Sequence, residues 1–428
     1  MTLDRAVHPR SERAFNRPGA PVMHPVTAAP VPGRWGPSPR SFAVFLLCAY
    51  VFLLPVQVSV PGGRVAPSDA FLLLYLLIWF PRITRVPSGW SRWHPALVAV
   101  FAMGSLVAYA RTGGVSLYAL GPKTAGLLFL LVGYTVLLDH CTSVARTRLL
   151  LQWFVAGVVL NAAVALAFYA VQRAGLLSTS RINYDDARLS GLLIDPNAFG
   201  GIAVVALVLH LWTVASPAPV WPWKWPRAVG LLLLVALALT FSRSAWIAFV
   251  ASALAALLIH GRAALRPLSK LYVASLGIGV GLALAYLPDL TSLALRPDQV
   301  TGRVSILRDA FGDFAHSPVF GIGLGASVEE HGVIIHNTTA WFATELGVIG
   351  LIVFLGFVGW YLRGLLALAL HQVDPIRSLA LAILLAQVAM LGLSVGIEAF
   401  YQRYWWVLFA AAGGLFATRV KSRDEADV

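Results

Sequence analysis

One histidine and three arginines are the residues of this sequence best suited to chemistry on a charged substrate. His336 directly precedes Asn337, at the start of a long apolar stretch. An imidazole titrates near neutral pH, so it is suited to taking a proton from a hydroxyl group. Arg188, Arg243 and Arg303 carry planar guanidinium groups, which pair well with phosphate oxygens. Together these residues predict chemistry at an anion site.

Five predicted helix starts face the same side as these residues. Asp195 precedes Pro196, which is favoured at the first helical position, and Asn337 is a good capping residue. Each start points unpaired amide N–H groups and the positive end of a helix dipole outward. If the starts converge, they form an anion site, and a lipid diphosphate suits such a site in a membrane. The starts lie at residues 68–69, 122–123, 195–197, 242–244 and 337–338.

Glu345 is a second residue of interest in the same helix. It follows His336 by nine residues, which places it about 13 Å further along a helix axis. A carboxylate at that depth needs a partner. Asn337, Trp341 and Glu345 share one helix face, so we expect Glu345 to support the site from below. The candidate substrate-binding residues are therefore Arg188, Asn197, Asn337 and Glu345.

Several of these residues have simpler interpretations. Arg243 could extend to lipid headgroups without binding substrate, and Asp195 could serve only as a helix cap. Lys123 fits a snorkelling or paired lysine better than a ligand. His331 and His336 are five residues apart, whereas helical metal ligands lie three or four apart, so we predict no metal site.

The glycine run that begins at Gly321 resembles part of a dinucleotide-binding fingerprint. It lacks the preceding strand, the following helix and the acidic residue that such a site requires. We therefore interpret it as a flexible turn beneath the site and predict no cofactor.

The composition predicts an all-α integral membrane protein of about twelve transmembrane helices. Hydrophobic residues make up 58% of the 428 residues and charged residues only 12%, against about a quarter charged in soluble domains. The mean hydropathy is +0.77. The second and seventh spans are short. The predicted spans are 41–58, 67–81, 95–110, 118–138, 149–171, 196–215, 228–241, 244–260, 271–287, 338–362, 378–397 and 401–418.

Lysine and arginine set the predicted orientation. With both termini in the cytoplasm, most of the 32 basic residues lie in inner loops and tails, as the positive-inside rule requires. The net charge of +13 thus reflects topology, and scattered basic residues argue against nucleic-acid binding. We predict a disordered basic tail at 1–40, a membrane domain at 41–418 and a second cytoplasmic tail at 419–428. Periplasmic loops are expected at 172–195 and 288–336.

The longer periplasmic loop is predicted to carry interfacial helices. Residues 301–316 place apolar side chains on one helical stripe, which suits a helix on the outer bilayer surface. The stripe consists of Ile306, Leu307, Ala310, Phe311 and Phe314.

The order and spacing of short motifs over roughly residues 180–400 resemble the bacterial O-antigen ligase and polymerase superfamily. The motifs are Arg188-Leu-Ser-Gly191, Asp195-Pro-Asn197, Ser242-Arg-Ser244, Arg303, His316-Ser-Pro318, Gly321-Ile-Gly323, His336-Asn337 and Glu345-Leu-Gly347. Leu307 is a departure, because the family often has Trp at this position after the arginine. That difference puts local acceptor or lipid contacts in doubt.

The resemblance implies a metal-independent, GT-C-like glycosyltransferase in the bacterial inner membrane, with its active site facing the periplasm. The donor would be an undecaprenyl-diphosphate-linked glycan. The acceptor would be lipid A-core in a ligase, or a growing glycan in a polymerase. By motif position, Arg243 and Arg303 would hold the diphosphate with help from Arg188, and His336 would be catalytic.

Three other functions stay open at this point. An exopolysaccharide polymerase and a protein O-glycosyltransferase would use similar chemistry on other acceptors. A transporter or flippase would place ionisable residues near the membrane midplane, where Glu345 is the clearest example here. Ligase and polymerase are not separated by any feature of the sequence.

Overall fold

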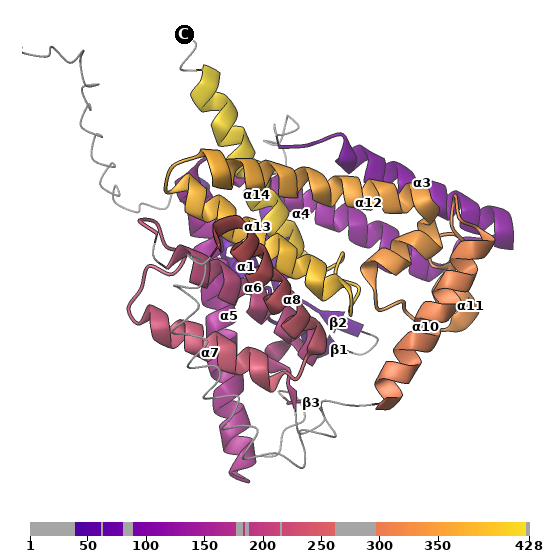
Figure 1. Ribbon diagram of the computed structural model, residues 1–428, viewed down its shortest axis with the longest axis horizontal. Helices are drawn as coiled ribbons and strands as arrows, with labels where there is room; N and C mark the ends of the chain where they lie inside the picture. Colours follow the sequence, from indigo (N-terminus) through magenta and orange to yellow (C-terminus); the bar gives the residue numbers. More distant parts are fainter. Residues whose placement is uncertain are drawn as a thin grey trace, which may run out of the picture.

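The structure is a computed structural model that describes residues 39–60, 63–79, 89–176, 183–184, 188–214, 216–261 and 297–424. These residues are predominantly α-helical (Figure 1). Two small antiparallel sheets complete the described part: β1 (Val58–Val60) pairs with β2 (Gly63–Val65), and β3 (Asn183–Tyr184) pairs with β4 (Arg188–Leu189).

The helices account for most of the described residues. In chain order they are α1 (Pro39–Phe52), α2 (Pro67–Trp79), α3 (Trp93–Thr112), the π-helix η2 (Ala119–Ala125), α4 (Gly126–His140), α5 (Val144–Arg173), the 3₁₀ turn η3 (Gly191–Leu193), α6 (Pro196–Thr213), α7 (Pro226–Leu239), α8 (Arg243–His260), α10 (Pro297–His316), α11 (Ala326–His331), α12 (Thr338–His371), α13 (Ile376–Ser394) and α14 (Arg403–Asp424).

Eleven of the predicted spans coincide with a helix, and the one at 271–287 lies outside the described residues. Within the described ranges, seven helices are long and apolar enough to cross a membrane. The second and seventh spans correspond to α2 and α7, which are short as predicted. The chain is therefore a multi-pass, all-α membrane protein, while the total of twelve spans stays a prediction. The predicted tail at 1–40 lies almost entirely outside the described residues, and α14 extends into the predicted tail at 419–428.

Polar side chains begin the helices where the sequence predicts. The Asp195 carboxylate accepts a hydrogen bond from the amide of Asn197 (2.8 Å), with Pro196 at the first position of α6. Asn337 caps α12 through the amide of Ala340 (2.9 Å). Ser242 caps α8 in the same way. Such caps satisfy backbone donors that have no partner within the helix.

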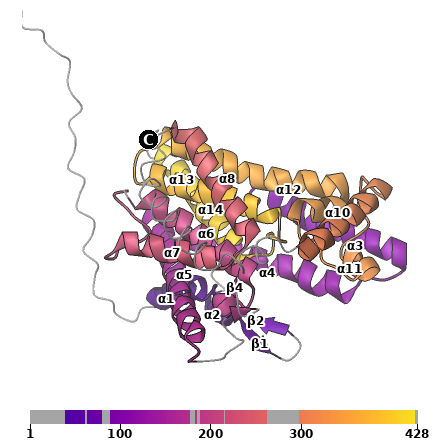
Figure 2. The same ribbon diagram turned by 60° about the horizontal axis from the view of Figure 1, so that its bottom comes forward.

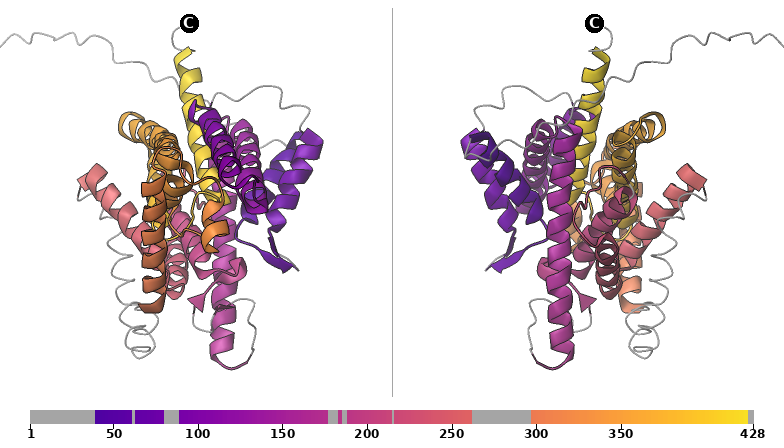
Figure 3. Two further views of the ribbon diagram at one scale, coloured as in Figure 1. Left: turned by 90° about the vertical axis from the view of Figure 1, so that its right-hand side faces the viewer. Right: turned by 90° about the vertical axis from the view of Figure 1, so that its left-hand side faces the viewer.

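Helix α13 lies at the centre of the bundle. It packs against α6, α8, α12 and α14, and most of its side chains are buried. Helix α12 runs alongside α3, and α10 and α11 also pack against α12 (Figure 2). The long helix α5 packs against α1 on the opposite flank (Figure 3). The arrangement leaves the start of α12 beside both α10 and the end of α13.

Helix α12 is broken at Gly347, whose φ of 67° and ψ of −168° are non-helical. The segment 318–323 closes the break with backbone hydrogen bonds, because unpaired amides are costly away from water. The glycine run is therefore buried and bonded to α12, and the prediction of a flexible turn there is wrong. We call residues 318–325 the glycine clasp. The bonds are Val348 N to Pro318 O (2.8 Å), Ile322 N to Thr344 O (2.9 Å) and Gly323 N to Glu345 O (3.0 Å).

We predict that Gly347→Ala destabilises the protein by about 2–4 kcal/mol. Its backbone conformation is almost exclusive to glycine, and a Cβ there would overlap the carbonyl of Val319. Gly359→Ala is the matched control, because Gly359 lies in the same helix with open space around it. Thermal unfolding of the two detergent-solubilised variants measures the stability of each. Equal melting temperatures for the two variants would contradict the role of the break.

Candidate functional site

The segment 395–402, which joins α13 to α14, is held against the start of α12. The Thr338 hydroxyl donates to the carbonyl of Ile397 (3.2 Å) and accepts from the amide of Ala399 (2.8 Å). The Asn337 side-chain amide donates to the carbonyl of Val395 (3.1 Å). Because Thr338 is fully buried, these bonds form in surroundings where an unpaired polar group would be costly. They fix the residues around His336.

The start of α8 reaches the same segment, and the start of α6 packs against α8. Gly396 lies directly against the Ser244 side chain, and a Cβ on this glycine would come within 3.6 Å of the guanidinium of Arg303. In α6, Gly200 packs tightly against Ala245 of α8. Helix α8 therefore begins next to the loop that also holds α12, and α6 begins beside α8.

The two remaining predicted starts also meet this region through ion pairs. Lys123 of η2 pairs with Glu398. Asp69 of α2 pairs with Arg403, the first residue of α14, at 2.6 Å. The structure thus brings four predicted helix starts together around residues 395–403, with Lys123 beside them. The prediction of a helix start at 122–123 is wrong, because both residues lie inside η2, which begins at Ala119.

His336 and Arg303 line one small pocket among these elements. Its volume is about 90 Å³. His336 is exposed in the loop before α12, and Arg303 is half-buried on α10. The lining residues are Arg303, Ile306, Leu307, His336, Val395 and Gly396.

A second arginine acts on Arg303. Partial burial and the nearby charge of Arg243 lower the pKa of Arg303, while Asp195 opposes them. Two guanidinium groups that repel each other favour an anion between or beside them. Arg243 is exposed at the first turn of α8, so its charge is accessible from the pocket side. The predicted pair of arginines is therefore assembled from two distant parts of the sequence.

The same charges set the properties of His336. Partial burial lowers the pKa of His336 most, and Arg303 lowers it further, whereas Glu398 and Asp195 raise it. The net effect is downward, so the ring is neutral at pH 7 and can accept a proton. The imidazole thus lies between cationic groups and carboxylates.

Arg188 lies behind the pocket. It is 5% exposed, and it donates to the carbonyl of Thr240 (2.9 Å) and to the side-chain oxygen of Asn197 (3.0 Å). These bonds connect the end of α7 to the first turn of α6. Neither Arg188 nor Asn197 is among the residues that line the 90 Å³ pocket.

Glu345 is also enclosed, at 1% exposed. Its carboxylate accepts a hydrogen bond from the amide of Gly325 (2.8 Å), so the expected partner is a backbone donor from the glycine clasp. Asn337 uses its side-chain oxygen to cap α12 and its amide to bind Val395. Both residues stabilise the surroundings of His336.

An apolar groove adjoins the polar pocket. Its volume is about 340 Å³, and it lies between α10 and α12. Residues 301–316 form part of α10 as predicted, and the apolar stripe of this helix lines the groove. Leu307 borders both spaces. The groove is lined by Leu307, Ala310, Phe311, Phe314, Asn337, Thr339, Ala340, Ala343, Thr344 and Leu351.

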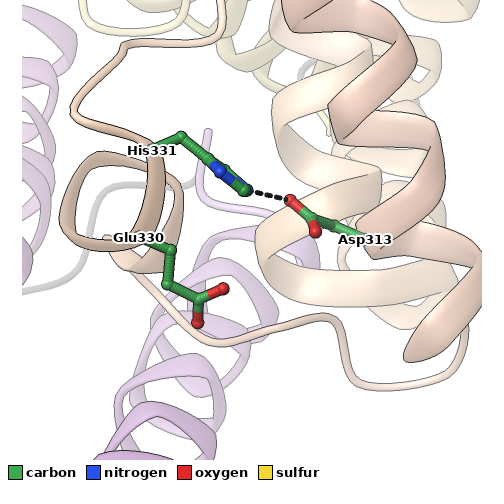
Figure 4. A group of neighbouring side chains, drawn as sticks. All are labelled: Asp313, Glu330 and His331. Carbon is green, nitrogen blue, oxygen red and sulfur yellow. Dashed lines mark hydrogen bonds and ion pairs between the residues drawn. The ribbon is translucent and has the colours of Figure 1, made fainter.

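Asp313, Glu330 and His331 form a separate cluster (Figure 4). The His331 ring points at Asp313, 3.0 Å away, and Glu330 pairs with Arg111 at 3.2 Å. Their ligand atoms lie within 4.8 Å of one another, which is compatible with a metal ion. Each group already has an ion-pair partner, and His336 is not part of the cluster.

Glu398 is the site residue that the sequence reasoning missed. The predicted spans end at 397 and begin again at 401, so the connecting residues received no role. A useful signal was present, since Glu398 is a lone carboxylate in a very short connection between two apolar stretches on the predicted outer side.

Comparison with known protein families gives one match. Residues 228–355 match the family described as O-antigen ligase. The matched region includes Arg243, Arg303, His336 and Glu345, whereas Arg188 and Glu398 lie outside it. No curated protein matches the chain. The match supports the superfamily that the order of motifs indicates.

Proposed function

We propose that this protein, whose residues 228–355 match the O-antigen ligase family, transfers glycan from undecaprenyl diphosphate to lipid A-core at the periplasmic face of the inner membrane. The observation that carries the proposal is that His336 and Arg303 line one pocket, with Arg243 acting on Arg303 from a neighbouring helix. The pocket thus combines a proton acceptor with one cationic group, and a second cationic group lies near it. Both termini would lie in the cytoplasm in this orientation.

The two arginines would bind the diphosphate. Negative charge grows on the leaving phosphate as its bond to the sugar breaks, and fixed guanidinium groups stabilise that charge. The starts of α6, α8 and α12 add the positive ends of three helix dipoles. These residues supply positive charge of the kind that other glycosyltransferases draw from a metal ion, in keeping with a metal-independent, GT-C-like enzyme.

His336 would act as the general base. The acceptor hydroxyl gives its proton to the neutral imidazole while its oxygen attacks the anomeric carbon of the donor sugar. The bond between that carbon and the diphosphate oxygen breaks, and its electron pair leaves with the diphosphate. The lowered pKa of His336 keeps the ring in the form that accepts a proton at pH 7.

The apolar groove between α10 and α12 suits the prenyl chain of the donor. It meets the pocket at Leu307, so a lipid lying in the groove would place its diphosphate beside Arg303. Leu307 is also the position where the family often has Trp. A smaller side chain there leaves the junction of the two spaces less filled.

The four candidate binding residues would have different roles. Asn337 lines the groove and is the one best placed to touch a lipid. Arg188 and Asn197 would hold the start of α6 against the end of α7, and Glu345 would hold the glycine clasp. An O-antigen or exopolysaccharide polymerase would use the same groups on a growing glycan acceptor.

We predict that His336→Ala lowers glycan transfer at least about 100-fold, the usual contribution of a general base. In the wild type, the rate should be constant around pH 7 and fall on acidification, because protonation of the imidazole below its lowered pKa removes the base. Purified protein and lipid-linked glycan in proteoliposomes give both measurements. His371→Ala, a change at the exposed far end of α12, is the control. Wild-type transfer by His336→Ala would refute this role.

Deletion of the gene is expected to strand full-length glycan on undecaprenyl diphosphate, because a ligase acts after chain growth. Mass spectrometry of the extracted glycolipids measures the length of the stranded chains. Single repeat units in place of long chains would instead indicate a polymerase. Normal glycolipids in the deletion strain would contradict both assignments.

A further inference from the structure

A buried ion pair beside the pocket has no part in the reaction described above. The side chains of Lys123 and Glu398 are only 3% and 14% exposed, and they pair directly. The ammonium group of Lys123 also lies 4.1 Å from the ring centroid of Trp341 and 5.0 Å from that of Tyr401. Desolvated cation–π contacts of this kind fix a lysine strongly.

The backbone holds Lys123 as firmly as its side chain is held. Lys123 lies in the π-helical turn η2, with Pro122 inside that turn. The Tyr401 hydroxyl donates to the carbonyl of Lys123 (3.0 Å). Single π-turns in a helix are frequent at functional sites. The result is a rigid anchor for the Glu398 carboxylate.

The other side of Glu398 is joined to the His336 loop. Ile397 and Ala399, its two neighbours, both bond to the Thr338 hydroxyl. Thr338 lies two residues after His336. Glu398 and His336 therefore lie on two chain segments that one buried hydroxyl holds together. The charge of Glu398 raises the pKa of His336.

Three charged groups from separate elements act on His336, and their signs oppose one another. Arg303 on α10 acts against a protonated imidazole, whereas Glu398 in segment 395–402 and Asp195 at the start of α6 act for it. Two further cations act on these groups: Arg243 on α8 acts on Arg303, and Lys123 on η2 pairs with Glu398.

We propose that Glu398, anchored by Lys123, is a positioning residue that stabilises the protonated form of His336 during transfer. The imidazole becomes a cation when it takes the acceptor proton, close to Arg303, which disfavours that charge. A fixed carboxylate offsets the effect of Arg303, while the proton remains on the ring. The effect on rate rests on the proposed function, whereas the effect on His336 itself does not.

The test measures the titration of His336 directly. Diethyl pyrocarbonate acylates neutral imidazole, so the pH dependence of His336 modification, followed by peptide mass spectrometry on purified protein, gives its midpoint of titration. Glu398→Gln is expected to lower this midpoint by about half a pH unit or more, because a nearby opposite charge is lost. Glu329→Gln, the same change at an exposed position on α11, should leave it unchanged.

Removal of one member of a buried ion pair leaves the other charge buried and unpaired, which can unfold the protein. The double variant Lys123→Gln/Glu398→Gln removes both charges, and it should show the lowered midpoint as well. A wild-type midpoint in either variant, at a wild-type melting temperature, overturns the proposal. So does an equal shift in Glu329→Gln.

Transfer assays separate this proposal from the proposed function. Glu398→Gln should reduce the rate about tenfold or more and move the acidic fall of the pH–rate profile to lower pH. If His336→Ala keeps full transfer while the Glu398 variants still shift the midpoint, the proposed function fails and the positioning role stands. If the midpoint does not move while His336→Ala is inactive, the positioning role of Glu398 fails and the proposed function stands.

Discussion

The hydrogen bonds between the Thr338 hydroxyl and segment 395–402 are the interaction on which the rest of the site depends. A helix that begins within or beside a membrane leaves amide groups without partners, and these must be satisfied by the protein or by a ligand. Here one connecting segment meets the starts of α8 and α12 and pairs with Lys123 of η2, while the start of α6 packs against α8 and the start of α2 pairs with the first residue of α14. The positive ends of several helix dipoles are thereby gathered in one place. An anion is the ligand that such an arrangement favours.

The distribution of charge follows from this convergence. Arg243 and Arg303 come from different helices and repel each other, so they are held together by the packing of the helices that carry them. Asp195 opposes the effect of Arg243 on Arg303. Arg303, Glu398 and Asp195 all act on His336, and its protonation is therefore set by the fold. The apolar groove continues from the pocket between α10 and α12, so polar and apolar parts of one lipid-linked substrate would find matching surroundings.

Much of this architecture was predictable from local signals. Apolar stretches located the helices, and capping residues such as Asp195 and Asn337 located their starts, because both depend on residues close in sequence. The break at Gly347 was not predictable, since it depends on pairing with segment 318–323. For the same reason the glycine run was misinterpreted as flexible. Lys123 and Glu398 are 275 residues apart, and only the fold shows that they meet. Arg188 looked like a ligand in the sequence, yet its bonds to Thr240 and Asn197 show that it connects helices.

Binding of the lipid diphosphate tests the central claim most directly. The affinity of the purified protein for undecaprenyl diphosphate, undecaprenyl monophosphate and undecaprenol would be compared by native mass spectrometry, in the wild type and in the Arg243→Gln/Arg303→Gln variant. Arg308→Gln, an exposed change on the same helix as Arg303, is the control. We expect the diphosphate to bind most tightly to the wild type. This preference should disappear in the Arg243→Gln/Arg303→Gln variant and persist in Arg308→Gln. Equal binding of undecaprenol and the diphosphate by the wild type would contradict the account.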